Sequence, residues 1–279
     1  MANAAIVAIG VAAWGLAVWL IVRLRSTRRV ALDLTEDMPA RERLARATAR
    51  VMGSTAGAVV AGVLVLGLGS RLMMRVLAAT SPASAQGRST DADEVVGVIS
   101  LDGTIGLLVF VGLFGGLLGL GLFVVLRRWL PDRSIRAGLV TGGIGAGLLA
   151  RPSGLLEPSN RDFAILSPTW LAVLLALALV ITFALLAAVL IDRWAASWPV
   201  PDRTLKGAAG LVPLVPLSLG VFPALAAVAA IGYKAFVAPG GRGTERFAFV
   251  DRPLRAVTVA AAVLGGAWTL AAAAQILTA

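Results

Sequence analysis

Two arginines of this chain are spaced so that they could bind an anion. Arg71 and Arg75 are four residues apart near the end of an apolar run, which places both guanidinium groups on one face of a helix. A guanidinium presents forked N–H donors that match two oxygens of a phosphate or carboxylate. The pair is therefore a candidate site for an anion or a lipid head group. The alternative is a structural ion pair with acidic residues that follow.

Those acidic residues are Asp91, Asp93, Glu94 and Asp102. They are expected salt-bridge partners of the two arginines and, more weakly, candidate ligands of a divalent cation, because closely spaced carboxylates can hold a metal that carries a substrate phosphate. Such a metal would fit an enzyme acting on a lipid-linked substrate. A single pair of aspartates is weak support for it, so we expect a solvated loop and no bound metal.

The composition excludes several kinds of chemistry. The chain has no His and no Cys, so it has no imidazole base, thiol nucleophile, disulfide or iron–sulfur ligand. No serine lies in a nucleophile-elbow sequence. The apolar runs contain no Asp or Glu, which disfavours proton- and cation-coupled carriers, since those place a carboxylate near the membrane midplane. We expect no cofactor and favour a protein that is not an enzyme.

Hydropathy determines which elements position these residues. Mean hydropathy is +0.89 and only 14% of residues are charged, against about 25% in soluble domains. Apolar runs of the length needed to cross a bilayer recur along the chain. We predict an all-α polytopic transmembrane bundle that forms one integral membrane domain over residues 1–279. Its eight predicted segments are 4–22, 51–77, 103–126, 135–150, 168–191, 207–220, 223–237 and 257–277.

The positive charges predict the topology. The net charge is +10, and it lies mainly in clusters between apolar runs, one of them the amphipathic stretch 39–50. Cytoplasmic loops of membrane proteins are enriched in Lys and Arg, so the cluster after the first segment predicts an extracytoplasmic N-terminus. No basic stripe with interleaved aromatics is present, so the expected partners are anionic membrane lipids and not nucleic acid. The excess of Arg over Lys, with abundant Ala and Gly, suggests a bacterial cytoplasmic membrane.

The apolar run 207–237 is ambiguous because it contains Pro213, Pro216 and Pro223. As a hairpin it leaves 20 of the 25 Lys and Arg residues on the cytoplasmic side, whereas a single crossing leaves 15. The hairpin is favoured, and it predicts an extracytoplasmic C-terminus. Each arm spans about 23 Å, less than the roughly 30 Å hydrocarbon core, so the sixth and seventh segments are short enough to be re-entrant. The three prolines are candidate hinges.

Glycines at four-residue spacing predict close helix packing. The two runs that carry them, 103–126 and 135–150, are expected to pack on each other. The glycines are Gly115, Gly119, Gly138, Gly142, Gly143 and Gly147.

Three classes of function fit this sequence. The first is a small transporter or a lipid- or anion-handling protein that uses Arg71 and Arg75. The second is a non-catalytic subunit or assembly partner, either in a homo-oligomer or with another membrane protein. The third is a membrane enzyme acting on a lipid-linked substrate through the acidic loop.

Overall fold

The protein is described by a computed structural model that covers residues 2–28, 38–90, 95–98, 100–150, 156, 160–200, 210, 212–213 and 243–278. Throughout these ranges the regular structure is helical and no strand forms, which confirms the predicted all-α class. Four helices in them are long and apolar enough to cross a membrane. They are Ala40–Thr80, Leu101–Leu126, Thr169–Ser197 and Pro253–Thr278.

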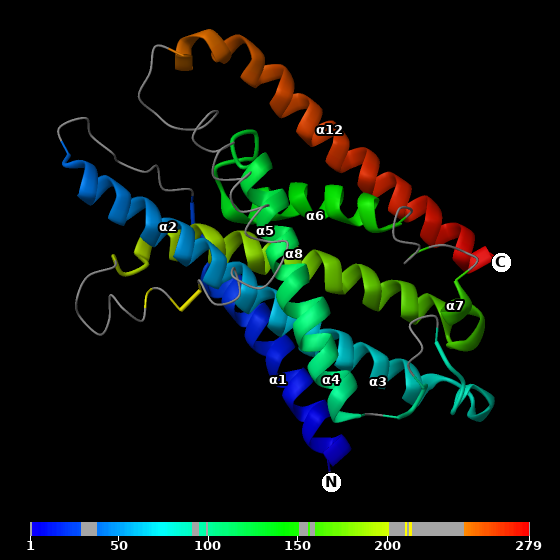
Figure 1. Cartoon of the computed structure of the whole chain (residues 1–279). Helices are drawn as coiled ribbons and strands as arrows, with labels where there is room; N and C mark the ends of the chain where they lie inside the picture. Colours follow the sequence, from blue (N-terminus) through cyan, green and yellow to red (C-terminus); the bar gives the residue numbers. More distant parts are fainter. Residues whose placement is uncertain are drawn as a thin grey trace.

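The described helices follow one another along the chain from Ala2 to Thr278. In order they are α1 (Ala2–Arg23), α2 (Ala40–Ala61), the π-helix η1 (Gly62–Gly69), α3 (Ser70–Thr80), the 3₁₀ turn η2 (Ala83–Ala85), α4 (Leu101–Gly106), the π-helix η3 (Leu107–Leu113), α5 (Phe114–Leu126), α6 (Ser134–Ala150), α7 (Arg161–Ile165), α8 (Thr169–Ser197) and α12 (Gly243–Thr278). Figure 1 shows α12 along the outside of the bundle beside α6, with the C-terminus near α7.

The helix made of α2, η1 and α3 is unbroken over 41 residues. At 1.5 Å per residue it is about 60 Å long, twice the roughly 30 Å hydrocarbon core. Its uncharged middle is bounded by Arg50 and Arg71; the residues before it are rich in arginine, and those after it include Arg75. The helix is therefore long enough for both ends to extend past the apolar layer.

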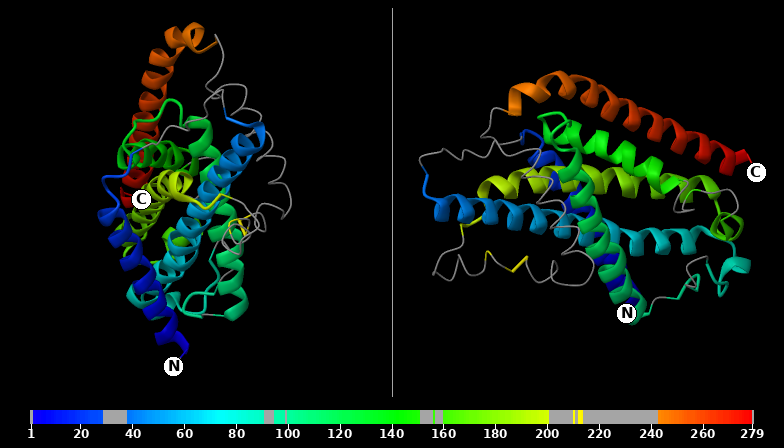
Figure 2. Two further views of the ribbon diagram at one scale, coloured as in Figure 1. Left: turned by 90° about the vertical axis from the view of Figure 1, so that its left-hand side faces the viewer. Right: turned by 45° about the horizontal axis from the view of Figure 1, so that its top comes forward.

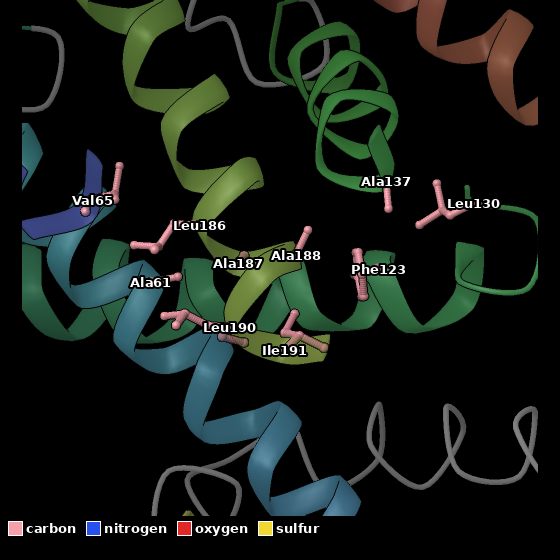
Figure 3. Close-up of a cluster of buried hydrophobic side chains, with 12 residues drawn as sticks. Ala61, Val65, Phe123, Leu130, Ala137, Leu186, Ala187, Ala188, Leu190 and Ile191 are labelled. Carbon is pink, nitrogen blue, oxygen red and sulfur yellow. The ribbon is translucent and has the colours of Figure 1, made fainter. Parts of the chain in front are cut away.

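The core of the bundle forms around α8. Leu186 and Leu190 of α8 are at most 1% exposed and lie in one cluster with Val65 of η1 and Phe123 of α5. Figure 3 shows these side chains converging from several helices. Small residues allow the close approach: a Cβ added to Gly57 of α2 would lie 2.8 Å from the Leu190 carbonyl carbon. Helix association in membranes depends on such packing.

The two π-helical segments, η1 and η3, pack against each other. A methyl group on Gly62 of η1 would collide with the carbonyl oxygen of Gly112 in η3. One turn further, a Cβ on Gly116 would lie 2.6 Å from the Ala58 carbonyl oxygen. The segment η1 interrupts the long helix of α2 and α3, and η3 interrupts that of α4 and α5, at the place where the two helices contact each other. Such interruptions are rare and occur frequently at functional sites.

Helix α6 lies between α8 and α12, as both views of Figure 2 show. A Cβ on Gly143 would lie 2.7 Å from the Ala262 carbonyl oxygen of α12, and Gly147 faces Gly265 of the same helix. The glycines of α6 therefore admit α12 at backbone distance.

The predicted segments coincide only in part with these helices. The second, third, fifth and eighth overlap the four long apolar helices. The first falls on α1, whose apolar part, Val7–Arg23, is shorter, and the fourth falls on the 17-residue α6. The sixth and seventh lie outside the described residues except for 210, 212 and 213. The eight-segment count and the re-entrant hairpin stay predictions.

Candidate anion-binding site

Arg71 and Arg75 lie one turn apart on α3 and line the same cavity, whose volume is about 110 Å³. Arg71 is 4% exposed and Arg75 is half-buried. The η1 segment ends at Gly69, so both arginines follow directly on the π-helix. The apolar residues that precede them are buried or half-buried, and Ser70 and Arg71 at the start of α3 are buried as well. The predicted pair thus shares one partly open cavity.

One wall of the cavity is formed by residues 95–98 of the loop after α3. The backbone N–H of Val96 donates to the Arg88 carbonyl at 3.0 Å, and Gly97 has φ +87°, which only glycine adopts without strain. Arg75 Nη1 donates to the Gly97 carbonyl oxygen at 3.4 Å. The side-chain amide of Gln86 donates to the Ala78 carbonyl of α3 at 2.7 Å. These bonds fold the loop back over the arginines.

The opposite wall comes from α7 and the turn after it, through Asp162 and Leu166. The Asn160 side chain caps α7 by accepting from the Asp162 N–H at 2.9 Å. Two hydrogen bonds between Ser81 and Ser167, at 2.9 and 3.2 Å, connect the end of α3 to this turn. Three segments distant in sequence therefore meet around the arginine pair, and Figure 1 shows α3 and α7 on the same side of the molecule.

The charges around the cavity are mixed. Two guanidinium groups and the Asp162 carboxylate line it, and Asp102, in the first turn of α4, is close enough to Arg71 to interact electrostatically. The predicted partners Asp91, Asp93 and Glu94 lie outside the described residues. In the described part of the chain, no three Asp or Glu side chains lie close enough to hold a metal ion.

The cavity size limits what could bind. About 110 Å³ corresponds to the volume of three or four waters at about 30 Å³ each. Pockets for drug-sized ligands usually measure roughly 300–1,000 Å³. This space therefore suits a small anionic group between two guanidinium forks, and not a whole large substrate.

Sequence reasoning missed a second charged site, at the other end of the bundle. Arg127, at the end of α5, makes two hydrogen bonds to Asp192 of α8, of 3.1 and 3.0 Å. Ser134 Oγ donates to the same carboxylate at 2.7 Å, and its N–H donates to the Thr27 carbonyl at 3.2 Å. The Arg127 guanidinium also lies 5.4 Å from the centre of the Phe123 ring. This cluster joins α5, α6 and α8 to the end of α1.

The predicted packing glycines lie against other helices than expected. Gly115 and Gly119 face Leu66 of η1 and Phe183 of α8, while Gly138 and Gly142 face α8 around Ala184. The remaining pair, Gly143 and Gly147, faces α12. The helices α5 and α6 thus pack little on each other, because the glycines of α5 face η1 and α8 and those of α6 face α8 and α12.

The predicted hinge prolines are described only in part. Pro213 is buried in a turn, where the Gly210 carbonyl accepts from Trp198 Nε1 at 2.9 Å. Pro216 and Pro223 lie outside the described residues.

Comparison with known proteins adds no assignment. No protein-family model, curated protein sequence or solved structure matches this chain. Its function is therefore argued from the two charged sites alone.

Proposed function

We propose that this chain is a small multi-pass membrane protein that binds an anionic group with Arg71 and Arg75 and takes part in transport or lipid handling. The observation that carries the proposal is that both side chains line one cavity while Arg71 is only 4% exposed. Arginines within membrane helices are costly and rare, and they usually mark a binding site or pathway. Two guanidinium forks one turn apart provide the donors that a phosphate or carboxylate requires.

We propose that the cavity faces the outside of a bacterial cytoplasmic membrane. The ends of α1, α5 and α8 and the starts of α2 and α6 carry most of the described arginines, and positive clusters mark the cytoplasmic side. With the predicted hairpin, the C-terminus is then extracytoplasmic. A reporter fused after Ala279 tests this orientation, and a cytoplasmic reading would contradict the hairpin.

Native mass spectrometry of the protein, purified gently from its own membranes, tests the binding proposal. We expect an anionic lipid or solute to be retained, and to be lost when Arg71→Gln and Arg75→Gln are combined. The matched control is Arg41→Gln with Arg43→Gln, which removes the same charge from exposed positions of α2. Each guanidinium–anion hydrogen bond is worth about 1.5–3 kcal/mol, so the loss should be large.

Other outcomes would favour the alternative functions. Retention that is unchanged in the Arg71 and Arg75 variant would contradict the proposal. A retained second polypeptide, without a small anion, would indicate a non-catalytic subunit. Turnover of a lipid-linked substrate that depends on Asp91 and Asp93 would indicate an enzyme.

A further inference from the structure

We infer that the anion is the head group of a membrane amphiphile, an anionic lipid whose acyl chains stay outside the cavity. The inference rests on the proposed function and specifies its ligand. Two observations support it: the depth of the arginines, and the size and apolar lining of the cavity.

The first observation is depth along the long helix. Twenty residues separate Arg50 from Arg71, and none of them is charged. At 1.5 Å per residue they span about 30 Å, which equals the hydrocarbon thickness of a bilayer. Arg71 therefore lies at the edge of the apolar layer, where lipid phosphates begin.

The register between α3 and α8 places the arginines somewhat deeper than this edge. A Cβ on Gly69 would lie 3.0 Å from Leu179 of α8, and Ser81 bonds to Ser167 just before that helix. The α3 residues between these two points run beside the first, apolar turns of α8. That stretch begins with the exposed Trp170, a residue type typical of the membrane–water boundary. The cavity is thus level with the head groups and the first part of the acyl chains.

The second observation is that size and lining fit only part of an amphiphile. A space of about 110 Å³ that opens to the surface accepts a phosphate-sized group, while a chain attached to that group continues outside. The lining residues Val95 and Val98 are 38% and 58% exposed, and the nearby Leu101 is 75% exposed. A soluble anion would gain nothing from these side chains, whereas an acyl chain that leaves the cavity would bury them. Each buried methylene strengthens binding by about fourfold.

The test compares three probes on the purified full-length protein in detergent: dihexanoyl phosphatidylglycerol, glycerol 3-phosphate and inorganic phosphate. We expect the lipid to bind at least about tenfold more tightly than either soluble anion, from the chain contacts alone. Arg71→Gln with Arg75→Gln should weaken lipid binding about a hundredfold.

A second variant separates the chain contacts from the charge. Val95→Asn with Val98→Asn should weaken binding of the lipid about tenfold and binding of glycerol 3-phosphate far less, because only the lipid has chains to contact these side chains. Both positions are exposed, so the fold should tolerate the change, and Val51→Asn at the exposed start of the apolar run is the matched control.

The outcomes distinguish this inference from the proposed function. Equal, arginine-dependent binding of all three probes would overturn the lipid inference and keep the anion site. Binding of the lipid that does not depend on the arginines, or no binding of any probe, would overturn both.

Discussion

The two ends of the bundle use arginine in different ways. At the ion-pair end, Arg127 makes two hydrogen bonds to Asp192 and a third, of 2.9 Å, to the Pro131 carbonyl. At the cavity end, the contacts of these side chains include one from Arg71 to Met74 Sδ at 3.8 Å and one from Arg75 to the Gly97 carbonyl at 3.4 Å. Arg127 is held in a bidentate ion pair, whereas Arg71 and Arg75 line a cavity.

The difference shows that burial alone does not identify a binding site. Arg127 and Asp192 have side chains only 12% and 7% exposed, and Arg71 is buried to a similar degree. What separates the two sites is geometry, because a bidentate pair leaves no room for a ligand. We therefore expect substitutions at the ion-pair end to change stability and substitutions at the cavity end to change binding.

The largest expected effect is at the ion-pair end. Asp192→Ala removes the carboxylate and leaves Arg127 buried without its partner, which should lower the free energy of unfolding by about 3–5 kcal/mol. Thermal or denaturant unfolding in detergent measures it. Asp192→Leu combined with Arg127→Met, which removes both charges, should recover much of that loss. A double variant as unstable as the single one would mean that packing, and not the buried charge, dominates.

The next effect lies between the two ends, where α5 meets α2 beside the contact of the two π segments. Gly116→Ala would place a methyl 2.6 Å from the Ala58 carbonyl oxygen and should destabilise the protein by about 1–3 kcal/mol. Gly121→Ala, in the same helix with nothing within 4 Å of the added Cβ, should be neutral or stabilise by up to about 1 kcal/mol. Equal melting temperatures of the two variants would contradict the close approach of these helices.

A smaller effect should sharpen the description of the cavity end. Asp162 lines the cavity with a negative charge, so Asp162→Asn should strengthen anion binding by about 0.5–1 kcal/mol and leave stability nearly unchanged. Titration with glycerol 3-phosphate or dihexanoyl phosphatidylglycerol measures the change. Weaker binding in Asp162→Asn would mean that the carboxylate instead positions the ligand or an arginine.

The smallest effect serves as a reference for the ion-pair end. Glu42 accepts a 2.7 Å bond from Arg46 four residues along α2, and both side chains are nearly half exposed. Glu42→Gln should cost at most about 0.5 kcal/mol. A loss as large as that of Asp192→Ala would show that exposure does not govern the strength of these pairs.

The helices could be predicted from the sequence because their signals are local. The apolar run 168–191 corresponds to α8 (Thr169–Ser197), and 103–126 corresponds to α4, η3 and α5. Length and hydropathy determine such elements without reference to the rest of the chain. The spacing of Arg71 and Arg75 is local too, which is why their common face could be predicted.

Contacts between distant segments could not be predicted in this way. Arg127 and Asp192 are 65 residues apart in sequence, and each by itself is an ordinary charged residue at the end of an apolar run. The glycine pattern indicated close packing but not which helix would fill each groove. The position of residues 95–98 as a wall of the cavity depends on hydrogen bonds such as those from Gln86 to the Ala78 carbonyl and from Arg75 to the Gly97 carbonyl. These bonds form only in the folded chain, so the sequence pattern does not reveal them.

The π-helical segment η1 determines how the cavity end responds to insertion and deletion. Every residue of an α-helix turns the chain by about 100°, and a π segment takes up an extra residue within an otherwise regular helix. Losing one residue from Gly62–Gly69 would let the α-helix continue unbroken and leave Arg71 and Arg75 on nearly the same face, whereas losing one from a purely α-helical stretch would rotate them by more than a quarter turn. Related chains that bind the same ligand should therefore vary in length within this segment more readily than in the α-helical turns beside it.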